Sequence, residues 1–558
     1  MSATADPITT EIIRNAFISA ADEMNATLIR SAYSWIIYEA KDCSVALLDE
    51  EKRVLGQSAG LPIFLGNLEI CIQLTEDAFG ADCWQPGDVW IMNDSYMTGT
   101  HLGDVTIFAP IHYDGELAGF SASRAHWYDI GAKDPGGPTD STEIYQEGLR
   151  LGPTKVMEGR RLREDIVDIL ARNSRLPDLT VGDLHAQIAV ARTGERRLAT
   201  ILDRYGVETV KAACEQIFAQ SAALDRAAVV AIPNGVYAAE GCLDNDGVSD
   251  DPFWVRMTIE VAGDEMAVDL SESSDSARGA INCGEAQTVS ACRVAFKRLI
   301  NPDRPATGGT FAPLKVKVRP GSLLAAEEPA ACQWYFTPLG LLIDLFAKAL
   351  APVMPEEVAA ASHGDSMVLF ITGEQNGRQF IHNDDLVGGW GAWDGSDGES
   401  CLINSVNGAL NDFPIEIVES RYPLRLRRYA LRGGSSGAGK WRGGCGTIRE
   451  LEILSEEAWL SLWYERSKTP AWGLFGGQSG KPPVVEVNPG TAHAKQMLKV
   501  NRLPLRRGDI VRCESGGGGG YGDPRERNHG LIEQDLREGV ITPAEAQAAY
   551  GYRKEEGP

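Results

Sequence analysis

At 558 residues the chain is long enough for roughly three or four lobes, and its 53 Lys and Arg against 78 Asp and Glu give a formal net charge of -25. Such an anionic surface repels nucleic acid and acidic membranes, so we expect neither as a partner. Eleven cysteines without a C-x-x-C pair, no signal-peptide pattern at the start and no apolar run long enough to cross a bilayer argue against a disulfide scaffold, a cysteine-built zinc site and a membrane protein, and favour a cytoplasmic location.

The N-terminal third alternates between helix and strand patterns. Apolar residues at helical spacing predict a helix over 6–34, with Pro7 near its start. Two apolar runs separated by the turn "EEK" predict a hairpin over 43–59, and "YDGE" predicts a second hairpin turn within 104–123.

Further along, sustained three- and four-residue spacing predicts helices from about 160 to 228. Strands at 237–246, 254–271 and 314–323 alternate with helices at 290–300 and 339–353, and a Gly-rich region with strand character follows. We therefore expect an α+β, multi-lobed fold with large mixed or antiparallel sheets and a central helical section. The expected divisions are an N-terminal α+β lobe over 1–155, a helical section over 156–230, an α+β lobe over 231–380, a Gly-rich β lobe over 381–525 and a helical tail over 526–558.

Two polar segments stand out at expected strand ends. "NDSYMTGTHLGD" carries His101 and Asp104, and "SRAHWYDIG" carries His126 and Asp129. A hairpin between the segments brings them together, and a few converging N and O donors are what a hydrolytic metal site needs. A single His or Asp at a strand end is more commonly a turn former or a hydrogen-bonded surface group, so local spacing leaves both interpretations open.

Other catalytic signatures are absent. The sequence has no G-x-S-x-G, no H-E-x-x-H and no G-x-G-x-x-G between a strand and a helix, and Cys43 has no base beside it. The six histidines outside the two segments are expected to be structural. The run "SGGGGGYGDP" is typical of a flexible linker by composition alone.

The motifs "NDSYMTGTHLGDVTIFAPI", "SRAHWYDIGAKDPGG", "CGEAQTVSACRVAFKRLINPD", "ERSKTPAWGLFGG" and "SGGGGGYGDP" closely resemble the hydantoinase B/oxoprolinase family, and the match runs almost from end to end. The family includes B subunits of ATP-dependent hydantoinases, part of 5-oxoprolinase, a caprolactamase subunit and, more distantly, alpha subunits of acetone carboxylases, which are longer than this chain. The resemblance implies that the glycine run is ordered.

The resemblance also implies a site and a partner. A divalent metal (Zn, Mn, Fe or Co) would be held by Asp42, His101, Asp104 and His126, with Asp129 beside it or as an alternate ligand. His126 and Asp129 are the expected catalytic groups. A HyuA-type ATPase subunit would use ATP to phosphorylate the carbonyl oxygen of a small cyclic amide, and a metal that lowers the pKa of water would supply the attacking group.

Two positions depart from the family pattern, where many relatives have His in place of Phe64 and Trp127. We expect these two residues, with Asn93 and Asp94, to bind substrate. The function that follows is the metal-bearing B subunit of an ATP-dependent cyclic amidohydrolase of the hydantoinase, 5-oxoprolinase or lactamase type, in a hetero-oligomer. The alternatives are an acetone-carboxylase-like or acetophenone-carboxylase-like subunit and a non-catalytic scaffold with a structural metal.

Overall fold

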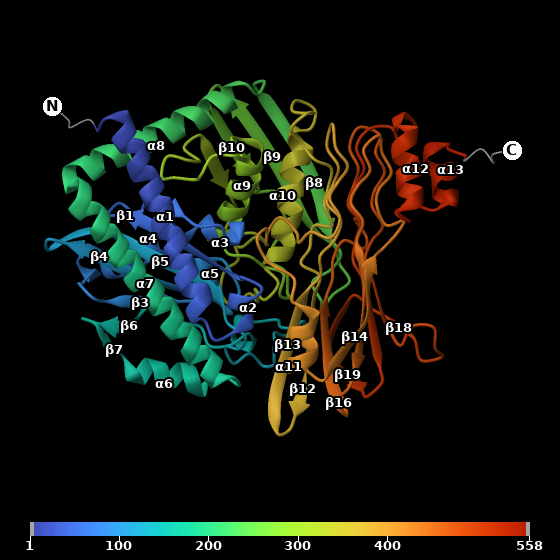
Figure 1. Ribbon diagram of the computed structural model, residues 1–558, viewed down its shortest axis with the longest axis horizontal. Coiled ribbons are helices and arrows are strands. Elements are labelled where there is room, and N and C mark those ends of the chain that lie inside the picture. The colour runs from blue at the N-terminus through green and yellow to red at the C-terminus, as the bar shows by residue number, and fades with distance from the viewer. Residues whose placement is uncertain (1–4, 554–558) are drawn as a thin grey trace.

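A computed structural model of the chain describes residues 5–553 and contains four β-sheets with helices packed on and between them (Figure 1). The expected α+β class with several large sheets is confirmed. Three of the sheets are wholly antiparallel, and the fourth contains one parallel pair. Within 5–553, no helix combines the length and the apolar character that crossing a membrane requires.

The N-terminal lobe is built on a seven-stranded sheet in the order β2-β1-β5-β4-β3-β6-β7. Both predicted hairpins are confirmed, since β1 pairs with β2 and β4 pairs with β5 in antiparallel register. The strands are β1 Cys43–Asp49, β2 Val54–Gln57, β3 Val89–Met92, β4 Asp104–Tyr113, β5 Glu116–His126, β6 Thr154–Glu158 and β7 Arg161–Leu162.

Helices cover both faces of this sheet. On one face α1 (Pro7–Ser31) lies beside α7 (Pro177–Tyr205), followed by α8 (Val207–Val230), and on the other face α4 (Leu68–Phe79) packs (Figure 1). Because side chains alternate along a strand, Val45 and Leu47 join the core on the α1 side, while Ala46 and Leu48 join the core on the α4 side. The shorter helices here are α2 Trp35–Tyr38, α3 Pro62–Leu65, η1 Ala81–Cys83, α5 Ser95–Thr98, η2 Ile144–Gln146 and α6 Glu164–Arg172.

The middle of the chain forms a four-stranded sheet, β11-β10-β9-β8, together with two buried helices. One of these, α10, is buried on almost every side, which explains why its sequence is apolar without a polar stripe. The bounds are β8 Gly235–Leu243, β9 Phe253–Ala262, β10 Glu265–Asp269, α9 Glu285–Leu299, β11 Leu314–Lys317 and α10 Phe336–Leu350.

Two antiparallel sheets, β13-β12-β16-β19 and β14-β15-β20-β17-β18, make up the C-terminal part. Their strands are β12 Val368–Gln375, β13 Arg378–Asp385, β14 Leu424–Leu431, β15 Thr447–Ile453, β16 Glu457–Trp463, β17 Val484–Val487, β18 Lys495–Gln496, β19 Lys499–Arg506 and β20 Ile510–Glu514. The helical elements are α11 Ile415–Arg421, η3 Pro524–Glu526, α12 His529–Arg537 and α13 Pro543–Tyr550.

The glycine run at 516–520 is ordered, as the resemblance implied, and the linker interpretation is wrong. All five glycines are buried, and four of their backbone N–H groups donate to carbonyl oxygens of Lys481, Gly444, Ala361 and Gln478. The run is therefore a packed backbone layer.

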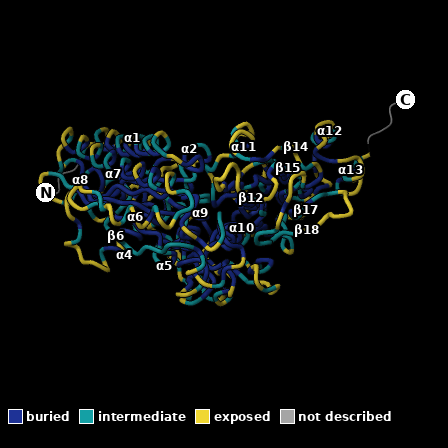
Figure 2. The backbone as a smooth tube through the Cα atoms, turned by 90° about the horizontal axis from the view of Figure 1, so that it is seen from below, coloured by how far each residue is buried: buried dark blue, intermediate teal, exposed yellow. Residues whose placement is uncertain are grey.

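Buried residues continue without a break through the length of the molecule (Figure 2). The largest hydrophobic cluster includes residues from α1 to β20, and three smaller clusters lie beside it, one on the α4 side of the N-terminal sheet and one at α12 and α13. The expected boundary between 380 and 381 falls inside strand β13. The five-part division stays a prediction, and its outermost residues, 1–4 and 554–558, lie outside the described range.

Candidate metal centre

The site forms where two paired strands have their free ends. Strand β4 begins at Asp104 and β5 ends at His126, and these two residues are direct partners in the antiparallel register. Both point to the face that α4 covers, because Phe108 and Ala122, an even number of residues away on the same strands, pack there. Asp42 comes directly before β1, and its carbonyl oxygen accepts a hydrogen bond from the His126 N–H at 3.1 Å.

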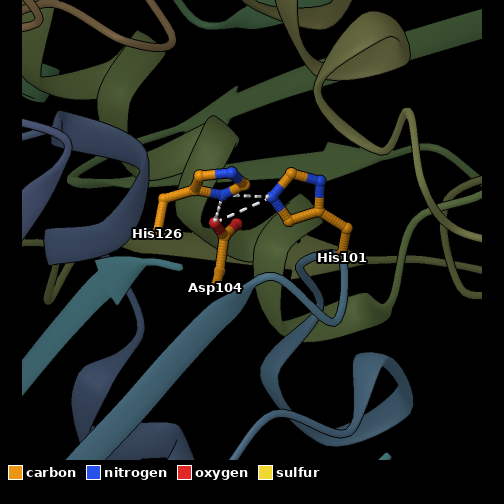
Figure 3. A group of neighbouring side chains, drawn as sticks. All are labelled: His101, Asp104 and His126. Atoms are coloured by element: carbon orange, nitrogen blue, oxygen red, sulfur yellow. Dashed lines mark hydrogen bonds and ion pairs between the residues drawn. The ribbon is translucent and has the colours of Figure 1, made fainter. Parts of the chain in front are cut away.

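His101 reaches the same point from the turn before β4. The short helix α5 ends at Gly99, whose φ of 83° reverses the chain, and the Asp104 N–H donates to the His101 carbonyl at 3.1 Å. This compact turn directs the His101 ring toward the end of β5. In Figure 3 the rings of His101 and His126 and the Asp104 carboxylate all point toward one centre.

The three converging atoms form a nearly equilateral triangle. His101 Nε2 lies 2.8 Å from Asp104 Oδ1 and 3.0 Å from His126 Nδ1, and the Asp104 to His126 edge is 3.0 Å. Ligands about 2.0–2.1 Å from one cation and at right angles to each other would be about 2.8–3.0 Å apart. The triangle therefore matches one face of a metal coordination shell.

Electrostatics at the triangle favour a positive charge. Burial opposes protonation of His101, but the Asp104 carboxylate, the Gln333 carbonyl and Asp42 together outweigh burial and raise the pKa of the imidazole. Burial likewise opposes ionisation of Asp104, yet His101 and His126 hold its pKa well below the usual range. Asp104 is thus a buried carboxylate stabilised by two imidazole neighbours, and a divalent ion at the centre of the triangle could stabilise it in the same way.

Asp42 lies beside the triangle and is not one of the three atoms that converge within 4.8 Å. Its Oδ1 is shielded from solvent and accepts no hydrogen bond from any described residue. Burial raises the pKa of Asp42 to about 7, against the opposing effect of His126. A buried carboxylate oxygen without a donor is costly, and a cation at the triangle would compensate it, so the residues present fit a metal.

A small cavity of about 20 Å³ adjoins the site, which is room for one water molecule. Its lining includes Gly103, His126, Tyr128, Glu147 and Gln333.

Asp129 is held away from the triangle. Its Oδ1 accepts a hydrogen bond from Arg175 Nη1 at 2.7 Å, and its Oδ2 accepts from the Arg175 backbone N–H. Arg175 also donates to the carbonyl of Ala132, so Asp129 anchors the loop that follows β5. A catalytic role for Asp129 stays a prediction that would need this ion pair to open.

The four expected substrate-binding residues have structural contacts. Phe64 and Trp127 are each 1 % exposed; Trp127 follows His126 on the strand, so its ring turns to the other face, where Nε1 donates to Gln187. Asn93 donates to the carbonyls of Leu102 and Leu149, and Asp94 caps α5 by accepting from the Tyr96 N–H. Trp127 also lines the small cavity. Substrate binding by these residues stays a prediction.

Comparison with known proteins identifies the family of the chain. A family model described as hydantoinase B/oxoprolinase matches residues 6–524. The chain belongs to the hydantoinase B/oxoprolinase family. It is 34% identical to the B subunit of a putative D-/L-hydantoinase from Pseudomonas sp. (strain NS671), over 98% of this chain and 95% of that protein.

This hydantoinase B/oxoprolinase chain is also similar to caprolactamase in both sequence and structure. It is 32% identical to the beta subunit of caprolactamase from Pseudomonas jessenii, over 98% of this chain and 96% of that protein. The crystal structure of ATP-dependent caprolactamase from the same organism superposes with a TM-score of 0.92 at 30% identity, covering 100% of this chain and 98% of that one. Acetone carboxylase shares the fold, with a TM-score of 0.89 at 19% identity over 99% of this chain and 80% of that one.

In this family member, sequence reasoning missed the residues that reach the site from distant segments. His101 Nδ1 lies 3.1 Å from the Gln333 carbonyl oxygen, and the Tyr335 hydroxyl donates to Asp104 Oδ2 at 2.9 Å. From β13, the Asp385 carboxyl comes close enough to Asp42 that burial and this like charge raise the pKa of Asp385 well above its usual value. All three lie more than 200 positions from the residues they approach, and no local motif marks them.

Proposed function

We propose that the chain is the metal-bearing B subunit of an ATP-dependent cyclic amidohydrolase, which opens a small ring such as a hydantoin, an oxoproline or a lactam. One observation carries the proposal: His101, Asp104 and His126 converge in a chain of the hydantoinase B/oxoprolinase family, similar over nearly its whole length to a hydantoinase subunit and a caprolactamase subunit. The subunit names of these relatives support a hetero-oligomer with a HyuA-type ATPase as the partner. Eleven cysteines without a C-x-x-C pair are the reason to propose a cytoplasmic location.

The metal would be held by His101, Asp104 and His126, with Asp42 as a fourth ligand after a small side-chain movement. Two carboxylates and two neutral imidazoles balance the charge of a divalent cation, and this mixed donor set suits Zn, Mn, Fe or Co. When bound, such a cation lowers the pKa of water and stabilises negative charge that develops on oxygen.

The chain's own residues would prepare the reaction in three ways. The buried walls around His126 exclude bulk water, so electrostatic effects are stronger there than in solvent. His126 Nδ1 faces the triangle, which leaves Nε2 of the same ring to exchange a proton with a substrate or water molecule in the small cavity that His126 lines. A relaxed ring amide is a poor electrophile, which gives the partner ATPase its role, because phosphorylation of the carbonyl oxygen creates a good leaving group.

Metal analysis tests the proposal directly. We expect the purified chain to carry close to one divalent ion, and the His101→Ala variant to lose most of it because one corner of the triangle is removed. His185→Ala is the matched control, since His185 is exposed on α7 and makes no contact with the site. An equal metal content in the parent chain and His101→Ala would contradict the assignment.

Activity separates this function from its alternatives. With an A-type ATPase partner and ATP, the parent chain should open a cyclic amide without bicarbonate, and His101→Ala should not. Strict bicarbonate dependence would favour carboxylation, and full activity of the metal-depleted variant would favour a structural role for the metal.

A further inference from the structure

We propose that the segment 331–335 is an orienting frame for the metal ligands, in which Tyr335 positions Asp104 and Glu147 positions His101 through the Gln333 peptide. This inference rests on the proposed metal site and deepens it. The frame comes from the connection before α10, whereas the ligands come from the N-terminal sheet, so the site would be completed by two parts of the chain far apart in sequence.

The contact to His101 decides which ring nitrogen is free. A carbonyl oxygen only accepts hydrogen bonds, so His101 Nδ1, 3.1 Å from the Gln333 carbonyl, carries the proton. The Gln333 side-chain amide nitrogen is farther from Nδ1, at 3.4 Å. With the proton on Nδ1, the lone pair of Nε2 points to the centre of the triangle, as a metal ligand requires.

The contact to Asp104 gives its two carboxylate oxygens different partners. Tyr335 is 3 % exposed, and its hydroxyl donates to Oδ2 at 2.9 Å. Oδ1 is the oxygen that faces both histidines. Tyr335 thereby holds the carboxylate in the orientation that presents one oxygen to a cation. Its ring also packs edge-on against the His101 ring, with 5.3 Å between the ring centroids.

Glu147 holds the frame itself. It is 1 % exposed, and its carboxylate accepts from the backbone N–H groups of Cys332 at 2.9 Å and Gln333 at 3.0 Å, and from the Ser141 hydroxyl at 2.7 Å. A buried carboxylate on the N–H of Gln333 fixes the direction of the peptide next to it and so the position of the carbonyl that receives His101. Hydrogen bonds in such a chain strengthen each other.

Further bonds leave the frame little freedom. Asn282 Nδ2 donates to the Ala331 carbonyl at 2.9 Å, the Trp334 N–H donates to the Ala280 carbonyl at 2.8 Å, and Trp334 Nε1 donates to the Pro138 carbonyl at 3.1 Å. These bonds tie the segment to two other stretches of the chain, around Pro138 and at 280–282. They explain how a stretch without regular secondary structure can hold two ligands in place.

Metal affinity is the test, measured on the full chain by titrating Zn²⁺ and Co²⁺ against a chelating dye at pH 8, above the pKa of about 7 that burial gives Glu147. Removing a group that orients a metal ligand typically costs about 10- to 100-fold in affinity, so we expect a loss of that size in Tyr335→Phe and in Glu147→Gln. Tyr335→Phe should also shift the visible absorption of bound Co²⁺, because the Asp104 carboxylate is released to rotate.

Matched variants control for the chemistry of the substitutions. Tyr33→Phe and Glu143→Gln make the same changes at exposed positions and should leave the metal Kd unchanged. The double variant Tyr335→Phe, Glu147→Gln should lose less affinity than the product of the two single losses, because both residues act through one segment.

The outcomes are separable. If the parent chain binds metal and Tyr335→Phe keeps its Kd within a factor of two, the orienting role is overturned, whether or not Glu147→Gln folds. Full additivity in the double variant would overturn the shared frame. Failure of the parent chain to bind either ion would instead defeat the proposed function.

Discussion

The glycine run 516–520 provides the sharpest test of how this fold is packed. A Cβ added at Gly518 would lie 1.9 Å from the Trp390 carbonyl oxygen, whereas ordinary contact begins near 3.4 Å. The Gly518→Ala substitution therefore forces two backbone segments apart by about 1.5 Å. A flexible linker would accept the same change without cost, or gain slightly from the reduced freedom of its unfolded chain.

The destabilisation can be worked from the contacts. Overpacking a dense region costs about 1–3 kcal/mol. The separation also stretches two backbone bonds, from the Gly518 N–H to the Gly444 carbonyl at 3.0 Å and from the Gly437 N–H to the Gly518 carbonyl at 2.8 Å. At about 1 kcal/mol each, these bring the expected loss in the free energy of unfolding to about 3–5 kcal/mol.

Thermal unfolding followed by circular dichroism measures this loss. For a cooperative unit of 150–250 residues, each kcal/mol shifts Tm by about 2–4 °C, so we expect a drop of at least about 6 °C. Gly152→Ala is the matched control, because its added Cβ meets no atom within 4 Å. A Tm for Gly518→Ala within about 2 °C of the parent value would refute the packed-layer interpretation.

Three further predictions follow from the site and its surroundings. Asp129→Asn should leave the metal-to-protein ratio unchanged, because Arg175 holds that carboxylate; a loss of metal measured by elemental analysis would make Asp129 a ligand. Saturation with the native metal at about 100 times its Kd should stabilise the chain by about 2.7 kcal/mol, and EDTA should remove this gain in a thermal melt. Burial and the neighbouring Glu465 raise the pKa of Asp365 to about 7, so between pH 4 and 7 the folded state keeps a proton that the unfolded chain releases. The free energy of unfolding should therefore fall as pH rises from 4 to 7. Asp365→Asn should lose up to about 4 kcal/mol less over this range than the parent chain, because Asn has no proton to release. Denaturant titrations at several pH values measure the difference. A parallel pH dependence in both chains would contradict this.

Local sequence patterns were sufficient wherever neighbours in the chain decide the structure. The turn "YDGE" makes β4 and β5 antiparallel neighbours, so the two polar segments at their far ends lie side by side. The exact pairing of Asp104 with His126 also depends on a register shift between Ile111 and His112, which the turn does not set. Pro7 lies in the first turn of α1, as the pattern at the helix start indicated, and Asp6 caps the helix by accepting from the N–H groups of Ile8 and Thr9.

Other features depend on segments that meet only in the folded chain. Composition cannot distinguish a linker from a packed glycine layer, because the deciding atoms, such as the Trp390 carbonyl, lie more than 100 positions away. In the same way, the direction of Asp129 is set by Arg175, and the proton on His101 by the peptide of Gln333.

The sequence by itself thus determined the long helices, the hairpins and the approach of the two polar segments, because hydrogen-bond periodicity and turn geometry act over a few residues. Only the tertiary structure decided which side chains support the site and which are already engaged elsewhere, because burial and hydrogen-bond partners are properties of contacts between distant segments.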